Sequence, residues 1–498
     1  MSQDQSTFRG EIKVASRIID YLSSGLYPSP GACLKELVNN SYDADASIVA
    51  VYVKPDADRI IIEDDGIGMT RDEFVTHFER VSESHKREKS ELTPSGRRPK
   101  IGKIGIGFIA ANEICEVMEV YSTKKGNSEL LHVTINFEEM RKPAEERRRT
   151  GGDFVKADYF GEILETTKAD HYTRIFLTGV RGEAQNILAG ARPQSASARS
   201  RSLYGMSSAS VQNALADPTL KSWKDFDSYS ETMLEVALNV PVRYHESWLP
   251  NPLQRKLRDI ESAVETLGFE VYYDGTELRK PVVFSPGERG ALINRFEFKG
   301  KHVAAQGYFY AQHGTIQPRD LHGLLVRIRN AAVGEFDDSF WGFSPSESSL
   351  IQRWVSAEIW ADDRLEEAMN IDRRTLREAH PAYVELRDAV HKHLRAVLSQ
   401  ARSQLYQSAN VERRDQRASV AITDVTNVVR TKVTQAARAE SFEKNWEKAV
   451  EQPRMRRALL KKFTVAELYE AVIESAQGVV TEEQLTEILR RLTARLGA

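Results

Sequence analysis

The chain has 498 residues, and its 69 Lys and Arg nearly balance 72 Asp and Glu, which leaves a formal net charge of −3. This balance excludes a uniformly basic nucleic-acid coat protein, although it permits a local basic face. Hydrophobic residues make up 41% of the chain, which excludes disorder throughout. Two cysteines, Cys33 and Cys115, are too few for a disulfide framework or a four-cysteine zinc site. At roughly 150 residues per domain, about three domains are expected.

The first segment, residues 1–180, alternates between helix and strand patterns. Ser29-Pro30 is a helix-start signal, a capping side chain followed by proline, and this helix is predicted to run toward Ala44. No run approaches the roughly 20 apolar residues of a membrane helix, and no signal pattern opens the chain, so a cytoplasmic protein without membrane contact is expected. β-rich runs predict five strands, the first two as a hairpin, at 48–53, 59–63, 116–122, 130–137 and 173–177.

Three further segments follow. Residues 181–225 contain a small, polar, aperiodic run and are predicted to be a linker or insertion. Residues 226–380 predict a second α/β domain with strands at 269–273, 303–311 and 324–329. From 381 to 498 helical spacing dominates, and Thr481 with Gln484 forms a capping box. The last helix carries one apolar stripe, Leu485, Ile488, Leu489, Leu492 and Leu496.

The first predicted helix carries a polar face. Glu36, Asn40 and Asp43 are spaced at i, i+4 and i+7 and therefore share this face, whereas Leu37, Val38 and Ser41 fall on the side expected to pack on a sheet. A carboxylate can act as a general base toward water, and an amide oxygen can ligate Mg²⁺. Taken alone, such a face is more often solvated surface.

A second motif, Asp64-Asp65-Gly66-Ile67-Gly68-Met69, directly follows a predicted strand. The carboxylate of Asp64 can accept a hydrogen bond from an exocyclic amine. Gly66 and Gly68 permit a tight turn that lets a flat base approach the backbone. An ordinary acidic turn is the alternative interpretation.

A third motif, Gly102-Lys103-Ile104-Gly105-Ile106-Gly107-Phe108, precedes a helical pattern at 109–114. Closely spaced glycines that open a helix form a phosphate cradle from backbone N–H groups and the positive end of the helix dipole. The spacing fits neither the Rossmann fingerprint nor the P-loop. A glycine-rich hinge is the alternative.

Together and in this order, the three motifs resemble those of the GHKL superfamily of ATPases, which includes gyrase B, the ninety-kilodalton heat-shock chaperone, histidine kinases and MutL. Residues 36–41 resemble the MutL version, and residues 64–69 and 105–108 resemble the chaperone version. The resemblance implies an α+β fold, with a two-layer α/β sandwich of the Bergerat type over 1–180. A transducer-like α/β domain and an all-helical C-terminal region would follow. It also implies ATP and Mg²⁺ as cofactors.

The resemblance implies roles for individual residues. Glu36 matches the carboxylate that activates the attacking water, Asn40 the Mg²⁺ ligand and Asp64 the residue that binds adenine. Thr173 matches a pocket threonine beside the adenine, although Tyr172 replaces the glycine that usually precedes it. The other matches surround the nucleotide: Asp43 near it, Gly66, Gly68 and Met69 at the base pocket, and Gly102, Lys103, Gly105, Ile106, Gly107 and Phe108 at the phosphate-binding hinge.

A polar segment at about 70–103 matches the ATP lid of the family, which closes over bound nucleotide. Lys86 or Lys103 could reach a phosphate from this segment, and a solvated lysine is the alternative.

Hydrolysis of a phosphoanhydride needs positive charge at the γ-phosphate, which a second domain often supplies. The run Asn370-Ile371-Asp372-Arg373 resembles the catalytic loop of the chaperone's middle domain, so Arg373 is the candidate and Asn370 would support its loop. Arg374, Arg327 and Arg329 compete for this role, and an arginine on a helix surface is the alternative.

The resemblance implies a slow Mg²⁺-dependent ATPase that acts as a nucleotide-gated homodimeric clamp, with 381–498 as a dimerisation or partner-binding region. Residues 401–498 contain 17 Lys or Arg against 13 Asp or Glu, a local charge of +4. This modestly supports a nucleic-acid substrate, in DNA maintenance or defence, by analogy with MutL-like and MORC-like proteins. A chaperone-like ATPase acting on a protein client is the alternative. A third possibility makes ATP a structural ligand of a binding module.

Overall fold

The protein is described from a computed structural model. It forms two compact units, Met1–Leu405 and Tyr406–Ala498. Within the part of the chain that the structure describes, no helix has both the length and the apolar character needed to cross a membrane. The described residues are 7–15, 29–53, 57–78, 80–81, 92–102, 107–138, 154–167, 171–190, 201–286, 290–343, 353–370, 373–407, 465–476 and 479–496.

A ten-stranded sheet organises the first unit, with strand order β10-β9-β2-β3-β8-β5-β6-β7-β1-β4. Neighbouring strands are antiparallel except for the pairs β1–β4 and β2–β9, which are parallel. The predicted pairing of the strands near 48–53 and 59–63 is confirmed, with Val49 opposite Asp64. The strands are β1 (Thr7–Ala15), β2 (Ile48–Tyr52), β3 (Arg59–Asp64), β4 (Arg80–Val81), β5 (Val117–Thr123), β6 (Glu129–Asn136), β7 (Phe154–Glu165), β8 (Tyr172–Thr178), β9 (Glu270–Tyr273) and β10 (Thr276–Glu277).

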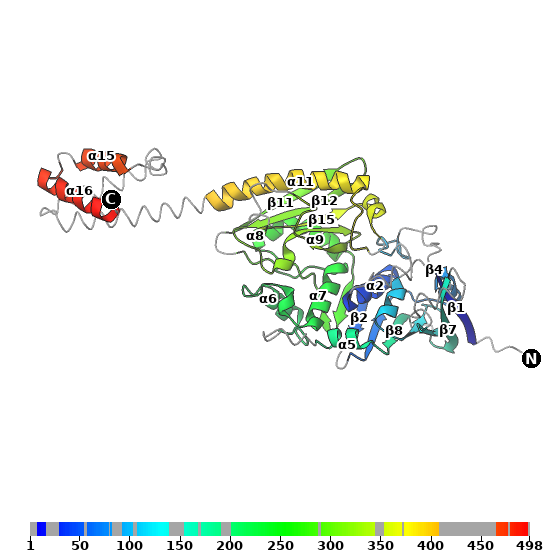
Figure 1. Ribbon diagram of the computed structural model, residues 1–498. Coiled ribbons are helices and arrows are strands. Elements are labelled where there is room, and N and C mark those ends of the chain that lie inside the picture. The colour runs from blue at the N-terminus through cyan, green and yellow to red at the C-terminus, as the bar shows by residue number, and fades with distance from the viewer. Residues whose placement is uncertain are drawn as a thin grey trace, which may run out of the picture. The chain divides into compact units, whose positions relative to one another are not determined.

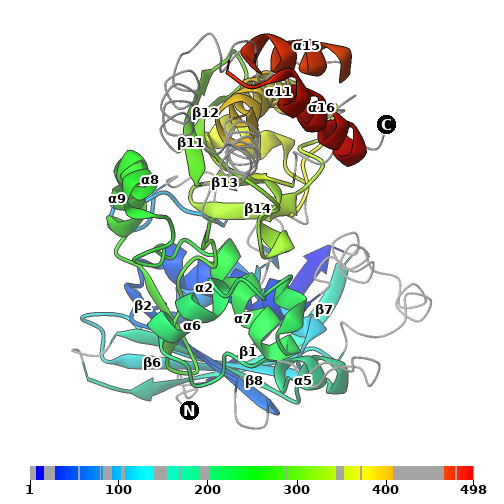
Figure 2. The same cartoon turned by 90° about the vertical axis from the view of Figure 1, so that its left-hand side faces the viewer.

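Helices cover one face of this sheet (Figure 2). The central one, α2 (Pro30–Asp43), begins as predicted, because the Ser29 hydroxyl accepts a hydrogen bond from the Ala32 amide at 3.1 Å. Leu34 and Val38 of α2 belong to the same buried core as Ile62 of β3. The other covering elements are α5 (Gly182–Leu188), α6 (Ser208–Leu215), α7 (Ser228–Asn239) and the 3₁₀ helix η2 (Gly107–Glu113).

A second, five-stranded sheet has the order β11-β12-β15-β13-β14. Its neighbours are antiparallel except for β13 and β15. The long helix α11 (Pro381–Ala401) lies along this sheet (Figure 1), and its Leu386, Val390 and Leu394 are fully buried there. The strands are β11 (Ala291–Lys299), β12 (Ala304–Gln312), β13 (Gly323–Ile328), β14 (Ala331–Asp337) and β15 (Val355–Ala361).

Shorter elements connect the sheets. They are α3 (Arg71–Phe78), η4 (Trp223–Asp225), α8 (Asn251–Gln254), η5 (Arg255–Leu257), α9 (Arg258–Glu265), η6 (Arg319–Leu321), η7 (Asp363–Ala368) and the π-helical turn η8 (Arg402–Gln407). The described part of the second unit contains α15 (Val465–Ala476) and α16 (Glu482–Leu496). The capping box predicted for α16 is present, because the Thr481 amide donates to the Gln484 side chain at 3.0 Å.

The expected α/β sandwich is confirmed, but the packing departs from the predicted segment boundaries in three places. In the predicted linker 181–225, Val211 and Leu215 of α6 are buried in the core of the first sheet. Strand β9, assigned to the second domain, pairs with β2 of the first sheet. Helix α11, assigned to the C-terminal region, belongs to the core of the second sheet. Sequence spacing fixes element types, whereas these assignments depend on contacts between distant residues.

Candidate functional site

A cavity of about 270 Å³ lies beside α2, at the ends of β3 and β8 and against the segment 92–102. Small-molecule sites usually occupy about 300–1,000 Å³, so this cavity is near the lower end of that range. Its lining residues come from the first two sequence motifs, from the segment 92–102 and from strands β5 and β8 and helix α3: Leu37, Asn40, Ser41, Asp43, Ala44, Asp64, Ile67, Gly68, Met69, Glu73, Pro94, Lys100, Met118, Val120, Thr173 and Ile175. The structure therefore brings together Asn40, Asp43, Asp64, Gly68, Met69 and Thr173, which the sequence predicts at one site.

Helix α2 is buried along its length except at Glu36 and Asn40. These two residues lie one turn apart on the same face, as their spacing predicts. Asn40 lines the cavity, whereas Glu36 lies one turn nearer the helix N-terminus and is not part of the lining. Within the described residues, the Glu36 carboxylate has no hydrogen bond or ion pair. The exposed face of α2 thus offers an amide at the cavity and an uncommitted carboxylate beside it.

Asp64, at the end of β3, is only 5% exposed. One carboxylate oxygen accepts a hydrogen bond from the Ser41 hydroxyl at 2.7 Å, and the other accepts one from the Gly66 amide at 2.9 Å. Burial raises the pKa of Asp64 to about 6, against the two hydrogen bonds, which lower it. Each oxygen retains acceptor capacity, so Asp64 can receive a further donor from the cavity. Ser41, expected to pack on the sheet, is instead part of the site.

The turn after Asp64 requires its two glycines. A Cβ atom on Gly66 would lie 2.8 Å from both the Ala44 carbonyl and the Asp64 carboxylate. Gly68 has a φ of +67°, and a Cβ atom there would lie 1.8 Å from the Thr123 carbonyl. Only glycine fits such a left-handed, closely packed position. The turn therefore brings backbone close to the cavity wall, as the second motif predicts.

Thr173 is 6% exposed and lines the cavity on β8. Its hydroxyl lies 3.0 Å from the hydroxyl of Ser122, which also accepts a hydrogen bond from the Met69 amide at 2.9 Å. Ser122 thus connects Met69 of the second motif with Thr173 of β8, both of which line the cavity. Sequence analysis missed Ser122, because a serine within a strand carries no signal until the neighbouring strand is known.

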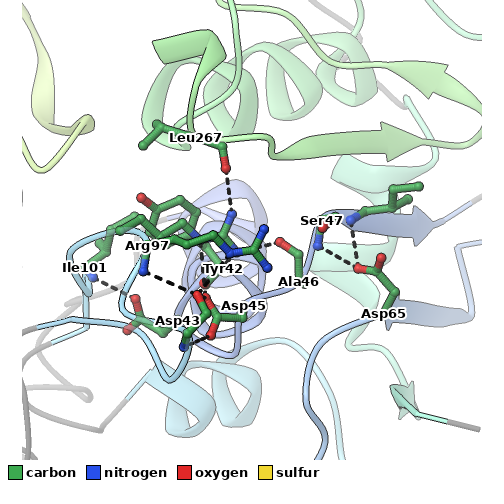
Figure 3. Close-up of polar contacts among 12 residues, drawn as sticks. Tyr42, Asp43, Asp45, Ala46, Ser47, Asp65, Arg97, Ile101 and Leu267 are labelled. Atoms are coloured by element: carbon green, nitrogen blue, oxygen red, sulfur yellow. Dashed lines mark hydrogen bonds and ion pairs between the residues drawn. The ribbon is translucent and has the colours of Figure 1, made fainter. Parts of the chain in front are cut away.

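Asp43, at the end of α2, holds the last part of the lid segment. Its two carboxylate oxygens accept hydrogen bonds from the backbone amides of Ile101 and Gly102, each at 2.7 Å (Figure 3). Lys100, immediately before them, lines the cavity. We call residues 92–102 the lid base. Asp43 therefore both lines the cavity and anchors the lid base.

Arg98 fixes the middle of the lid base to the end of α2. Its guanidinium donates to the carbonyls of Tyr42 at 3.0 Å and Leu267 at 3.0 Å and to that of Ala46, and it lies 4.1 Å from the Tyr42 ring centroid (Figure 3). Carbonyls at a helix C-terminus lack partners within the helix, so an arginine there satisfies them and complements the helix dipole. The Asp45 carboxylate accepts hydrogen bonds from the amide and the hydroxyl of Ser95, which also belongs to the lid base.

The segment after η7 that contains Arg373 approaches the N-terminal half of α2. We call this segment, between the paired residues Met369 and Leu376, the arginine loop. Arg373 has a left-handed backbone, with φ of 53°, and is half-buried. Lys35, which precedes Glu36, has a lowered pKa because it is buried and because the charges of Arg373 and Arg374 oppose its own. Arg374 pairs with Glu335 at 2.8 Å. Among the described residues, Arg373 forms no ion pair, in contrast to Arg374.

The two arginines of β13 and its turn occupy different environments. Arg327 is fully buried and pairs with Glu358 at 2.6 Å, which removes it from the candidates for the γ-phosphate. Arg329 pairs with Asp363 at 2.8 Å and also donates to the Lys100 carbonyl of the lid base. It therefore contacts the lid base and not the cavity itself.

Some predicted site residues lie outside the described residues, namely Lys86, Lys103, Gly105 and Ile106. Gly107 and Phe108 begin η2. Their expected roles stay predictions. The sequence motifs do not mark Ser122 or Lys100 as site residues, and helical spacing places Ser41 on the side expected to pack on a sheet. Lys100 could have been found by its position two residues before Gly102, whereas the serines depend on tertiary contacts.

Comparison with known proteins places this site in a family. Residues 28–153 match the family described as histidine kinase-, DNA gyrase B-, and HSP90-like ATPase. Over 116 residues, the chain is 39% identical to a putative type II restriction enzyme, HgiDII, of Herpetosiphon aurantiacus, covering 23% of this chain and 18% of that protein.

Chaperones are also similar to part of the chain. A chaperone protein HtpG of Bacillus subtilis is 27% identical over 186 residues, 33% of this chain and 28% of the relative. A mitochondrial 75 kDa heat shock protein of Bos taurus is 26% identical over 139 residues, 24% of this chain and 19% of the relative. The chain thus matches less than a third of the length of each of these relatives.

Proposed function

We propose that the protein is a Mg²⁺-dependent ATPase, because residues 28–153 match the family described as histidine kinase-, DNA gyrase B-, and HSP90-like ATPase. The observation that carries the proposal is the single cavity in which Asn40, Asp64 and Thr173 meet the lid base. The buried Asp64 carboxylate, with one hydrogen bond on each oxygen, has capacity to accept a hydrogen bond from the adenine amine. Pro94 and Lys100 of the lid base line the same cavity, and the phosphates would extend toward them.

Asn40 would hold the cation through its amide oxygen, which is a ligand type that Mg²⁺ accepts. Among the described residues, no group of three or more His, Cys, Asp or Glu could hold a metal ion. A Mg²⁺ ion at this site would therefore take most of its ligands from phosphate oxygens and water, as is usual for this ion. When bound, it would neutralise charge on the phosphates.

Glu36 would polarise the attacking water, because it lies one turn from Asn40 on the exposed face of α2. Replacing Glu36 by Gln should lower kcat by about 10²–10⁴-fold, the usual contribution of a general base, with ATP affinity changed by less than about threefold. Phosphate release and binding of a fluorescent ATP analogue measure the two quantities. Glu129→Gln, on the exposed start of β6, is the matched control. Unchanged phosphate release in Glu36→Gln would refute the assignment and favour ATP as a structural ligand.

We further propose that Arg373 supplies positive charge to the γ-phosphate when the lid closes. Its loop lies close enough to α2 for its charge to act on Lys35, the residue before Glu36. Because closure must precede chemistry, turnover should be slow.

The working assembly we propose is a homodimeric clamp gated by nucleotide. The similarity to HtpG supports this, and residues 406–498, outside the first unit, are the candidate dimerisation region. Size-exclusion chromatography with light scattering, with and without a non-hydrolysable ATP analogue, tests it. A mass that stays monomeric in both samples would overturn the clamp.

The clamped substrate we favour is nucleic acid, in DNA maintenance or defence. Two observations support it, the similarity to a putative restriction enzyme and the local charge of +4 over 401–498, from 17 Lys or Arg against 13 Asp or Glu. Filter binding of duplex DNA over a salt series tests it, because affinity through phosphate contacts falls with salt.

The similarity to HtpG supports a protein client as the second candidate. Suppression of aggregation of a heat-denatured protein, with no DNA binding, would favour that function.

A further inference from the structure

Arg329 lies at the tip of the hairpin between β13 and β14. Arg329 and Asn330 have φ values of 53° and 68°, so both occupy the left-handed region that a two-residue hairpin turn requires. The Asn330 side chain accepts a hydrogen bond from the Trp360 indole at 2.9 Å, which fixes the turn to β15. The tip is therefore held in a defined place, and it presents the Arg329 side chain toward the first sheet.

The Arg329 guanidinium contacts two separate segments. On one side it donates to the backbone carbonyl of Lys100 in the lid base. On the other side it pairs with Asp363 at 2.8 Å and with Glu366 at 3.3 Å, both in η7. The Arg329 side chain is only 11% exposed, so its charge-assisted contact with the buried Glu366 is shielded from water, whereas Asp363 is half exposed.

On the lid-base side, the residue that Arg329 contacts borders the cavity. Lys100 lines the cavity, and the next two amides, of Ile101 and Gly102, are both held by Asp43. The short segment 100–102 is thus held by a first-domain carboxylate through its amides and by Arg329 through its first carbonyl.

The η7 side leads directly to the arginine loop. The residue after η7, Met369, pairs with Leu376 across the loop, and the Asn370 amide donates to the Thr375 carbonyl at 3.0 Å. Arg373 lies within this closed loop, and its amide donates to the Asn370 carbonyl at 3.1 Å. A displacement of η7 would therefore move Arg373 with it.

We propose that Arg329 is a positioning residue that couples the lid base to the arginine loop. It holds η7, and hence Arg373, in register with the segment of the lid that borders the cavity. This inference rests on the proposed ATPase function, because Arg373 matters only if a γ-phosphate is transferred. Arg98 cannot play this part, because its guanidinium donates to the carbonyls of Tyr42, Ala46 and Leu267, which lie outside η7 and the arginine loop.

Kinetics of Arg329→Gln test the coupling. We expect kcat to fall by about 10- to 100-fold, the scale at which small displacements of catalytic groups slow enzymes, while KM for ATP changes by less than about threefold. In the Arg373→Ala background, the same change should lower kcat by less than about twofold, because positioning an absent group has no effect. Arg364→Gln is the matched control, since Arg364 also lies in η7 but contacts the Asp362 carboxylate and the Lys301 carbonyl instead.

Hydrogen–deuterium exchange gives a readout that does not depend on hydrolysis. In the nucleotide-free protein, Arg329→Gln should speed exchange in peptides covering both 92–102 and 369–377, whereas Arg364→Gln should leave 92–102 unchanged. Additive losses of kcat in the double variant, or wild-type exchange at 369–377 in Arg329→Gln, would overturn the proposal. A wild-type protein that hydrolyses no ATP would instead refute the proposed function, and the exchange result alone would then decide whether Arg329 joins the two segments.

Discussion

Two carboxylates of the first unit, Asp64 in the cavity and Glu358 between the two sheets, are both buried but are used differently. Glu358 receives four hydrogen bonds, two from Arg327 and one each from Tyr244 and Tyr308. Asp64 receives two, from Ser41 and Gly66. A carboxylate has about four lone-pair sites, so Glu358 is saturated and Asp64 is not.

The two carboxylates also differ in pKa, which is raised at Asp64 and lowered at Glu358. Burial, the largest influence on both groups, raises the pKa of Asp64 to about 6. At Glu358 the Arg327 charge and the tyrosine hydroxyls outweigh burial and hold its pKa below the usual range. A saturated, paired carboxylate contributes to the fold, whereas one with spare acceptor capacity beside a cavity is available to a ligand. The comparison thus supports the proposal that Asp64 binds the nucleotide.

Breaking the saturated pair should give the largest effect. Arg327→Met removes two of the four donors to Glu358 and leaves its charge unpaired, so the free energy of unfolding should fall by about 3–5 kcal/mol. Urea denaturation followed by circular dichroism measures it. Arg295→Gln is the control, because its pair with Asp259 is exposed and should contribute less than about 1 kcal/mol. Equal effects of the two variants would contradict the distinction between the sites.

A substitution at the unsaturated carboxylate should act on binding instead of stability. Asp64→Asn keeps an acceptor for the Gly66 amide and offers a donor to Ser41, so the free energy of unfolding at pH 8 should change by less than about 1 kcal/mol. Affinity for ATP should fall by about 100-fold, since the charged acceptor for the adenine amine is lost. Titration of a fluorescent ATP analogue checks this. An affinity within threefold of wild type would remove Asp64 from the site.

Gly68, in the cavity wall beside Asp64, can be compared with Gly96, which has open surroundings. The comparison separates the effect of close packing from that of the backbone conformation. Gly68→Ala places a Cβ atom against the Thr123 carbonyl and should destabilise the protein by about 2 kcal/mol and weaken ATP binding. Gly96 has a similar φ of +72° but nothing within 4 Å of the added atom, so Gly96→Ala isolates the cost of the backbone conformation. Thermal unfolding with and without ATP should separate the two. Matching losses in both variants would show that close packing at Gly68 is unimportant.

Local sequence rules were sufficient for much of this site. The spacing of Glu36 and Asn40 predicts their shared face, and these are the two residues at which α2 is not buried. The glycines after Asp64 predict a turn that the backbone conformation requires. Each inference depends on residues within a few positions of one another, where helical periodicity and backbone sterics decide the outcome.

Other features could not be predicted locally. Every residue of β13 is buried, so alternation along the strand gives no signal to separate Arg327, paired in the core, from Arg329 at the hairpin tip. Ser41 turns toward Asp64 because β3 ends beside α2, which the helix pattern does not contain. The pairing of β9 with β2 likewise depends on chain far from either strand. These are tertiary contacts, and they override local preferences.

The smallest effect we expect is a pH dependence that separates binding from stability at Asp64. Because its pKa in the folded protein, about 6, is above the ordinary 3.8, the protonated form is favoured by folding. Its contribution to stability is therefore full at low pH and is lost as pH rises through about 6.

ATP binding needs the ionised form, so affinity should be constant above pH 7 and fall by about tenfold per pH unit below 6. Comparing wild type with Asp64→Asn at each pH cancels the other titrating groups. Parallel pH profiles in the two proteins would show that Asp64 is not the acceptor, whereas opposite trends in affinity and stability would confirm that one carboxylate controls both.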